Sequence, residues 1–183
     1  MPRYYIPKEY FKIVPKEKID KYLEATDDEE FKTLLKLVWL TGARLTEIIE
    51  LKYDNFTITR DGVIINIKAK KHGKVGYPSF SFEDPYVRDV LNFIEKRKEF
   101  DRIFRRGKRR YQQILLDLNK KIYGDNTKEY ITFHYLRHSR ITFLARKLGA
   151  LPEELKGWTG HRSTAFEEYF APRRVARFRG KIR

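Results

Sequence analysis

The sequence of 183 residues contains no cysteine and only one methionine. Without cysteine, the protein has no disulfide, no thiol nucleophile and no cysteine-ligated zinc site. It also lacks an apolar run of about 18 residues that could form a membrane-spanning helix. The start, Met1-Pro2-Arg3-Tyr4-Tyr5, leads directly into polar sequence and shows no secretory signal pattern. Together these absences predict a cytoplasmic protein with no membrane contact.

Acidic residues are scarce relative to basic ones. The chain has 25 Asp and Glu against 40 Lys and Arg, which gives a formal net charge of +15. A charge of this size on a foldable chain predicts a polyanionic partner, and nucleic acid is the first candidate. Lys, Glu, Arg, Ile and Tyr are abundant, a composition that is typical of hyperthermophilic proteins. An archaeal virus or plasmid is therefore the source that we expect.

The rest of the composition is sufficient for a hydrophobic core. Hydrophobic residues make up 41% of the chain, which contains 13 Phe and 12 Tyr. No repeat, low-complexity tract or linker divides the sequence. We therefore expect a single domain over residues 1–183, with an extended lead over 1–15. A basic tail over 172–183 follows, in which six of twelve residues are Lys or Arg.

Hydrophobic spacing and capping residues predict a mainly α-helical α+β fold. The expected helices cover residues 16–25, 29–41, 45–51, 84–98, 111–123 and 133–148, and a further helix begins at 152. Between 56 and 82 the pattern changes to β-strands over 57–59, 63–67 and 75–82. An Asp-Gly turn joins the first two strands, and 70–74 form a second turn. The sequence thus predicts a small three-stranded antiparallel sheet.

Five residues carry the candidate chemistry. Two arginines can clamp a phosphate through paired N–H donors, two histidines can transfer protons near neutral pH, and a tyrosine can act as a covalent nucleophile. They are Arg44 in Thr41-Gly42-Ala43-Arg44, His134 and Arg137 in His134-Tyr135-Leu136-Arg137-His138, His161 in Thr159-Gly160-His161, and Tyr169.

Two neighbours of these residues have expected structural roles. Glu47, three residues after Arg44, is a candidate salt-bridge or orienting partner. His138 shares a helix face with His134 and is expected to be a hydrogen-bonded helix residue rather than a catalyst. Each motif is weak when it is taken alone, and the order of all of them is what points to phosphoryl transfer.

The ordered set resembles the catalytic domain of the tyrosine recombinases, the phage-integrase family. It consists of Thr-Gly-x-Arg-x-x-Glu, a hairpin with lysines, His-x-Leu-Arg-His, Gly-His and Tyr, and the resemblance extends from about Lys16 to Tyr169. It implies that Arg44 and Arg137 bind phosphate, that His134 and His161 are acid–base or phosphate-contacting residues, and that Tyr169 is the nucleophile. A hairpin lysine completes the set; Lys70 fits best, and Lys71 and Lys74 are alternatives.

The resemblance also implies a reaction. It is DNA strand cleavage and rejoining through a 3′-phosphotyrosyl intermediate, without metal, ATP or another cofactor. The sequence departs from the family pattern at Thr159, where Leu is usual, and the interval from His161 to Tyr169 is about one residue shorter. The N-terminal core-binding domain of the family is expected to be absent. Double-stranded DNA is the expected partner, with self-association as a dimer or tetramer on it.

Three basic clusters are expected to contact the DNA backbone. The predicted contact residues are Lys71, Lys74, Arg105, Arg106, Arg109, Arg110, Arg173 and Arg174. Two alternatives to a recombinase stay open at this point: a type IB topoisomerase, which uses the same chemistry, and a catalytically idle DNA-binding module. An RNA-binding protein is less favoured, because no aromatic-rich strand motif is present.

Overall fold

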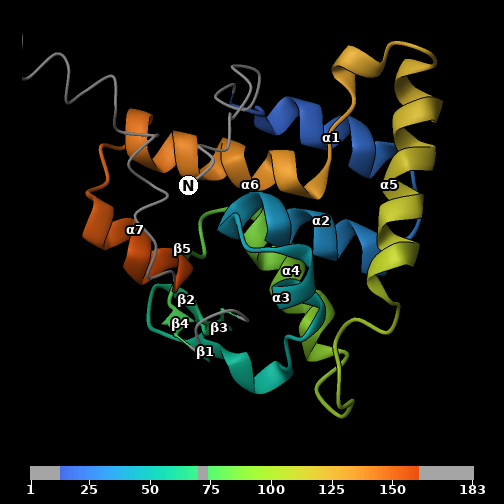
Figure 1. Cartoon of the computed structure of the whole chain (residues 1–183). Helices are drawn as coiled ribbons and strands as arrows, with labels where there is room; N and C mark the ends of the chain where they lie inside the picture. The colour runs from blue at the N-terminus through green and yellow to red at the C-terminus, as the bar shows by residue number, and fades with distance from the viewer. Residues whose placement is uncertain (1–12, 70–73, 161–183) are drawn as a thin grey trace, which may run out of the picture.

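The computed structural model describes residues 13–69 and 74–160, and α2 is the central one of its seven α-helices (Figure 1). Helix α2 packs against α1, α3, α4 and α6, while α5 contacts α1 and α3. The helix bounds are α1 Lys16–Glu24, α2 Glu29–Thr41, α3 Leu45–Ile49, α4 Pro85–Glu95, α5 Lys108–Tyr123, α6 Phe133–Thr142 and α7 Pro152–Thr159. Helices α3 and α4 end earlier than expected, and α5 begins three residues earlier.

Helix α2 has the bounds that the sequence predicts. The Asp28 side chain accepts a hydrogen bond of 3.0 Å from Phe31 N and so caps the helix start. Gly42 ends the helix with a φ of 67°, a conformation that glycine adopts without steric penalty. Phe31, Leu34 and Val38 are fully buried, so the apolar face of α2 forms the centre of the core.

The three-stranded antiparallel sheet is confirmed, but two of its predicted strands are wrong in extent. Its order is β1 (Phe56–Ile58), β2 (Gly62–Ile65) and β5 (Ser79–Ser81), and a separate pair joins β3 (Ile67–Lys68) to β4 (Val75–Gly76). The first break lies at Asn66, whose N–H donates to Asn55 O at 2.8 Å. The second lies at Pro78, which has no N–H to give to a ladder.

Helix α6 is also shorter than predicted. The Thr132 hydroxyl caps its start by accepting from Tyr135 N at 3.0 Å. Instead of continuing to 148, the α-helix ends at Thr142 and passes into a π-helical turn, η4 (Phe143–Lys147). The wider turn is closed by Leu148 N donating to Phe143 O at 3.1 Å. Hydrophobic spacing does not distinguish this turn from a regular helix.

The described residues form two hydrophobic clusters of very different size. The large one joins α1 to α6 with the sheet. The small one consists of Ile141, Leu144, Ala145 and Leu155, and it attaches α7 to α6 and η4. Within the described chain, no helix is both long and apolar enough to cross a lipid bilayer. Residues 1–12 of the predicted lead over 1–15, and the basic tail, lie outside the described residues.

Candidate functional site

Three of the predicted site residues come together in space. Arg44, His134 and Arg137 line one pocket of about 180 Å³, although α3 to α5 separate the first from the other two in the chain. Arg44 precedes α3, and the other two belong to the first half of α6. The remaining lining residues are Leu45, Thr46, Lys108, Gln112 and Phe133. Two guanidiniums and an imidazole therefore converge on one small, positively charged hollow.

Arg44 is held by Glu47. The Glu47 carboxylate accepts from Arg44 N at 2.8 Å and pairs with Arg44 Nη1 at 3.2 Å. The first contact caps the start of α3 with a negative charge, which the helix dipole favours. The Glu47 side chain is 1% exposed and that of Arg44 is 34% exposed. The expected salt bridge is thus confirmed, and it directs a half-buried guanidinium to the pocket.

Arg137 is buried and ties α6 to the segment before Arg44. Its Nη1 donates to Gly42 O at 2.7 Å. One turn later, Arg140 donates from Nε to Trp39 O at 2.7 Å. The Arg140 guanidinium lies over the rings of Trp39 and Phe143, at 4.5 and 5.2 Å from their centroids. Two arginines of α6 therefore fix the backbone that carries Arg44.

Burial lowers the pKa of Arg140 to about 10, although Asp84 opposes the shift. The side chain still carries its charge at neutral pH. Its contacts also explain why residue 42 is glycine. A Cβ at Gly42 would lie 2.9 Å from Arg140 Cβ, and the φ of 67° disfavours any side chain.

His134 and His138 form a pair on α6. Their Nε2 atoms are 2.9 Å apart and the rings meet edge to face. Burial, His134 and Arg137 lower the pKa of His138 from 6.5 to about 4. Burial, Arg137 and Arg44 likewise lower the pKa of His134. Both rings therefore favour the neutral form at neutral pH, and His138 is confirmed as a hydrogen-bonded helix residue.

Lys108 and Gln112 are pocket residues that the sequence did not single out as site residues. They are four apart on the first turns of α5, so they share a helix face. Lys108 lies in a dense basic stretch, but the predicted helix began only at 111. A helix that begins at 111 does not contain Lys108, so Lys108 and Gln112 could not be placed on one helix face. The usable signal was Gly107, which directly precedes the helix.

The start of α5 is fixed by a network around the buried carboxylate of Glu30. The Tyr111 hydroxyl donates to Glu30 Oε1 at 2.5 Å, and Arg97 Nη2 lies 3.4 Å from Oε2. Arg106 pairs with Asp28 and approaches Glu30 at 3.9 Å. The network joins the N-terminal end of α2 to the residues before Lys108, so it places that lysine in the pocket.

The other predicted DNA contacts have different surroundings. Arg105 is exposed and lies over the Phe100 ring at 4.3 Å from its centroid. Arg109 and Arg110 are exposed on the first turn of α5, and Lys74 is exposed before β4. Their role in DNA binding stays a prediction. Outside the described residues lie Lys70, Lys71, His161, Tyr169, Arg173 and Arg174.

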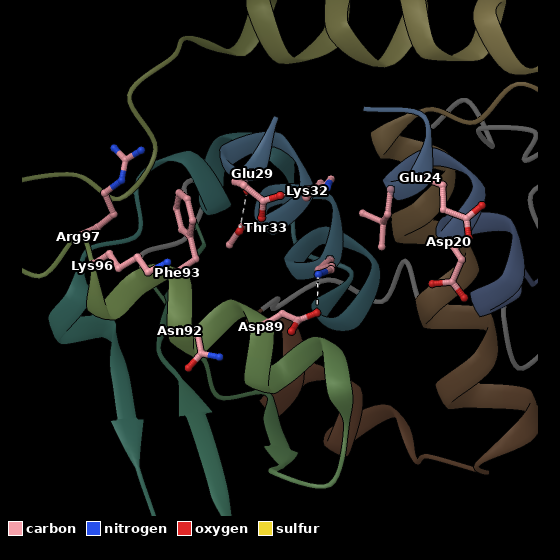
Figure 2. A pocket seen from close by; sticks show the side chains of 12 residues that line it. Asp20, Glu24, Glu29, Lys32, Thr33, Asp89, Asn92, Phe93, Lys96 and Arg97 are labelled. Carbon is pink, nitrogen blue, oxygen red and sulfur yellow. Dashed lines mark hydrogen bonds and ion pairs between the residues drawn. The ribbon is translucent and has the colours of Figure 1, made fainter. Parts of the chain in front are cut away.

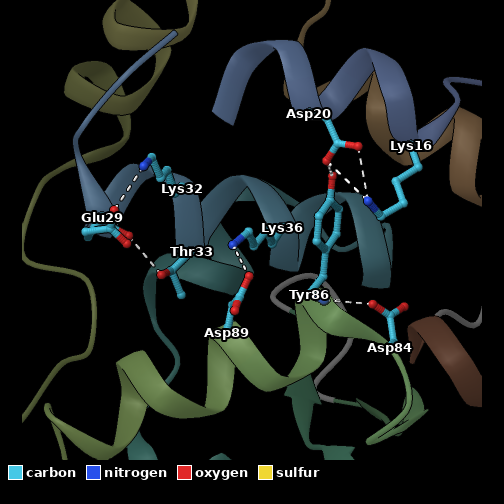
Figure 3. A network of polar contacts seen from close by, with 9 residues as sticks. All are labelled: Lys16, Asp20, Glu29, Lys32, Thr33, Lys36, Asp84, Tyr86 and Asp89. Atoms are coloured by element: carbon cyan, nitrogen blue, oxygen red, sulfur yellow. Dashed lines mark hydrogen bonds and ion pairs between the residues drawn. The ribbon is translucent and has the colours of Figure 1, made fainter. Parts of the chain in front are cut away.

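A larger hollow of about 710 Å³ lies between α1, α2 and α4 and contains none of the predicted site residues (Figure 2). Its lining contains two ion pairs, Lys36 with Asp89 at 2.7 Å and Lys32 with Glu29 at 3.0 Å (Figure 3). Four acidic and four basic side chains line the hollow, so it offers no net charge to a ligand.

The comparisons with known proteins identify the family of the chain. Residues 12–171 match the model of the phage integrase family. The chain belongs to this family. No curated protein matches the chain. The resemblance inferred from the motifs is thus confirmed over nearly the whole sequence.

Solved structures of tyrosine recombinases have the same fold. XerH site-specific recombinase bound to difH substrate matches with a TM-score of 0.67 and 20% identity, over 87% of this chain and 49% of that chain. XerA recombinase matches with a TM-score of 0.64 and 20% identity, over 86% of this chain and 59% of that chain. A lambda integrase dimer bound to a COC′ core site matches with a TM-score of 0.57 and 15% identity, over 83% of this chain and 58% of that chain. The chain spans about half the length of these proteins, and at such identities the likeness shows the fold.

Proposed function

We propose that the chain is the catalytic domain of a site-specific DNA recombinase, which cleaves and rejoins DNA strands through a covalent phosphotyrosyl intermediate. The observation that supports this best is the convergence of Arg44, His134 and Arg137 on one pocket. The family match supplies the context. The proposed domain covers residues 1–183, and its catalytic set is Arg44, Lys70, His134, Arg137, His161 and Tyr169.

The two arginines stabilise the transition state in this proposal. Attack on a phosphodiester puts additional negative charge on the phosphoryl oxygens, and guanidiniums bind such oxygens through several directed N–H donors. Glu47 and Gly42 O hold the two guanidiniums before the substrate arrives. Preorganised charge of this kind needs no rearrangement during the reaction, and it supplies the role that a metal ion has in other phosphoryl transferases.

Proton transfer completes the reaction. A tyrosine with a pKa of about 10 is almost fully protonated at neutral pH, so Tyr169 must lose its proton as it attacks. His134 favours its neutral form because burial and two arginines lower its pKa, and it is therefore able to accept a proton. The leaving 5′-oxygen takes a proton from a hairpin lysine, with Lys70 first and Lys71 or Lys74 as alternatives. Rejoining reverses these steps with a 5′-hydroxyl of another strand.

Double-stranded DNA is the proposed substrate, and the chain is proposed to act in the cytoplasm as a dimer or tetramer on DNA. Among the similar structures, XerH is bound to its difH substrate, and lambda integrase forms a dimer bound to a core site. The net charge of +15 supports binding to the DNA backbone. Integration of a viral or plasmid genome is the biological role that we propose from the family and the composition.

The test is a suicide-substrate assay with nicked DNA in EDTA, resolved on a denaturing gel. Wild-type protein is expected to give a covalent protein–DNA band, and Tyr169→Phe is expected to bind DNA without forming it. A band that persists in Tyr169→Phe would identify another nucleophile. No band with wild type on any site tried, together with retained DNA binding, would favour an idle DNA-binding module.

The same proteins distinguish a recombinase from a type IB topoisomerase. Strand exchange between two sites is the expected result with wild type. Relaxation of supercoiled DNA without exchange would favour the topoisomerase.

A further inference from the structure

Three segments that are far apart in the sequence meet at the C-terminal end of α7. The Trp158 indole Nε1 donates to Thr41 O at 2.7 Å. The Trp158 ring meets the Phe80 ring of β5 edge to face, with centroids 5.3 Å apart. Just before it, Gly157 O accepts from Tyr77 N at 2.9 Å. The end of α7 is therefore hydrogen-bonded both to the last residue of α2 and to Tyr77, which lies between β4 and β5.

Two glycines make the contact between β4 and α7 a contact of bare backbone. A Cβ at Gly76 would lie 2.4 Å from Trp158 O and 2.8 Å from Gly160 N. A Cβ at Gly160 would lie 2.7 Å from Gly76 N and 2.9 Å from Lys74 O, and its φ is 69°. The neighbouring atoms are backbone atoms, which cannot rotate away. Any side chain at Gly76 thus separates β4 from α7.

Each of the three segments leads to a residue of the proposed catalytic set. Thr41 precedes Gly42, whose carbonyl binds Arg137, and Arg44 follows. Strand β4 pairs with β3 in the register Ile67↔Gly76, and Ala69 N donates to Lys74 O at 2.8 Å. This hairpin contains the candidate lysines in its sequence, and Lys74 is the one that the structure describes. In the sequence, His161 directly follows Gly160.

We propose that Gly76, Trp158 and Gly160 are positioning residues, which fix the strands β3 and β4 that lead to the candidate lysines relative to Arg44. This inference rests on the proposed function. A proton donor to the leaving oxygen acts only when it is within hydrogen-bond distance of it, so a displaced hairpin loses protonation before it loses DNA binding. The contact at the end of α7 sets that distance through the backbone.

The test compares two alanine variants, Gly76→Ala and Gly157→Ala. The second is the matched control, because a Cβ at Gly157 has no atom within 4 Å. Each variant cleaves two DNA substrates that differ in one atom, the bridging 5′-oxygen or a sulfur in its place. In cleavage, the Tyr169 Oη–P bond forms and the bond from phosphorus to the bridging atom breaks. An oxygen then takes a proton from the lysine, whereas a thiol has a pKa of about 8.5 and leaves as the thiolate without one.

Gly76→Ala is expected to lower the cleavage rate constant of the oxygen substrate roughly a hundredfold, the range of one general acid. With the sulfur substrate its rate should return to that of wild type, and Gly157→Ala should match wild type on both. A general loss of folding would slow both substrates equally. If Gly76→Ala lost the same factor in cleavage rate on both substrates, or lost none on the oxygen substrate, the proposal would be overturned.

A second measurement needs no DNA and no activity. The protein has two tryptophans, so the solvent exchange of the Trp158 indole N–H can be followed separately by NMR. Its exchange should become faster in Gly76→Ala and stay slow in Gly157→Ala. Slow exchange in both variants would overturn the coupling, even if the wild type formed no covalent adduct and the proposed function failed.

If Gly76→Ala does not fold, Trp158→Phe tests the same proposal. It keeps a ring against Phe80 and removes the donor to Thr41 O. It should show the same preference for the sulfur substrate. Equal rates of Trp158→Phe and wild type on the oxygen substrate would show that this hydrogen bond does not position the site.

Discussion

Arg137 Nη1 donates to the carbonyl oxygen of Gly42 at 2.7 Å, and this bond joins the two arginine motifs of the site. Gly42 ends α2 and lies two residues before Arg44. Arg137 is buried, so the bond is shielded from water. One arginine of the pocket therefore fixes the backbone of the other. Substitutions of the two should then differ in their effect on folding.

Arg137→Ala is expected to reduce stability by ~1–3 kcal/mol, because Gly42 O loses its buried donor. Arg44→Ala should reduce it less, since the Arg44 side chain is 34% exposed. Both should abolish the covalent adduct while DNA affinity falls only slightly. Urea unfolding and the adduct assay check this. Equal stability losses would mean that the bond to Gly42 is not shielded.

Gly42→Ala is expected to destabilise the protein by ~1–3 kcal/mol, because a residue other than glycine is strained at this φ. The Cβ would also lie 2.9 Å from Arg140 Cβ. Gly107→Ala is the control, since a Cβ there has no atom within 4 Å. Thermal unfolding of the two variants gives the comparison. Similar melting temperatures would contradict the close packing of Arg140 on the end of α2.

The histidine pair predicts a pH dependence of stability. The pKa of His138 is lowered from 6.5 to about 4, so between these values the unfolded chain binds more protons than the folded one. The free energy of unfolding should therefore rise with pH through this window, and this contribution is lost as pH falls toward 4. His138→Gln should make the rise shallower. An unchanged slope in urea titrations from pH 4 to 6.5 would rule out His138 as its source.

Tyr111→Phe is expected to destabilise the protein by ~1–3 kcal/mol, because the buried Glu30 carboxylate loses a donor. Burial and the bond to Glu30 raise the pKa of Tyr111, so it is the protonated hydroxyl that donates at neutral pH. Tyr77→Phe is a control at an exposed tyrosine. Denaturant unfolding gives the free energy of unfolding of both variants. Equal free energies would show that the Glu30 network does not need the Tyr111 hydroxyl.

Lys108 is expected to contact a phosphate, because it lines the pocket of Arg44 and Arg137. The slope of log affinity against log salt concentration is negative, and Lys108→Ala should make it less steep by about 1. Lys120→Ala removes an exposed lysine near the other end of the same helix and serves as the control. DNA binding is measured over a range of salt concentrations. Equal slopes for the two variants would exclude a phosphate contact at Lys108.

Much of the fold could be predicted because its signals are local. Asp28, the apolar face of α2 and Gly42 define that helix within consecutive residues. The break at Asn66 could not be predicted, because it depends on a bond to Asn55 outside the strand. The π-helical turn at Phe143 could not be predicted either, because its hydrophobic spacing is that of a regular helix. Arg44 and Arg137 could be matched to a family motif. Lys108 could not, since its place depends on the Glu30 network, which joins residues more than a helix apart.

The small cluster of Ile141, Leu144, Ala145 and Leu155 has a consequence for how the molecule opens. Helix α7 contributes its buried apolar residue to this small cluster and not to the large one. A helix held in this way can unfold while the rest of the protein stays native. Backbone amides of α7 should therefore exchange with solvent sooner than those of α2, which has the large cluster around it. A subglobal opening of this kind would release Gly160 and leave Arg44 and Arg137 in place.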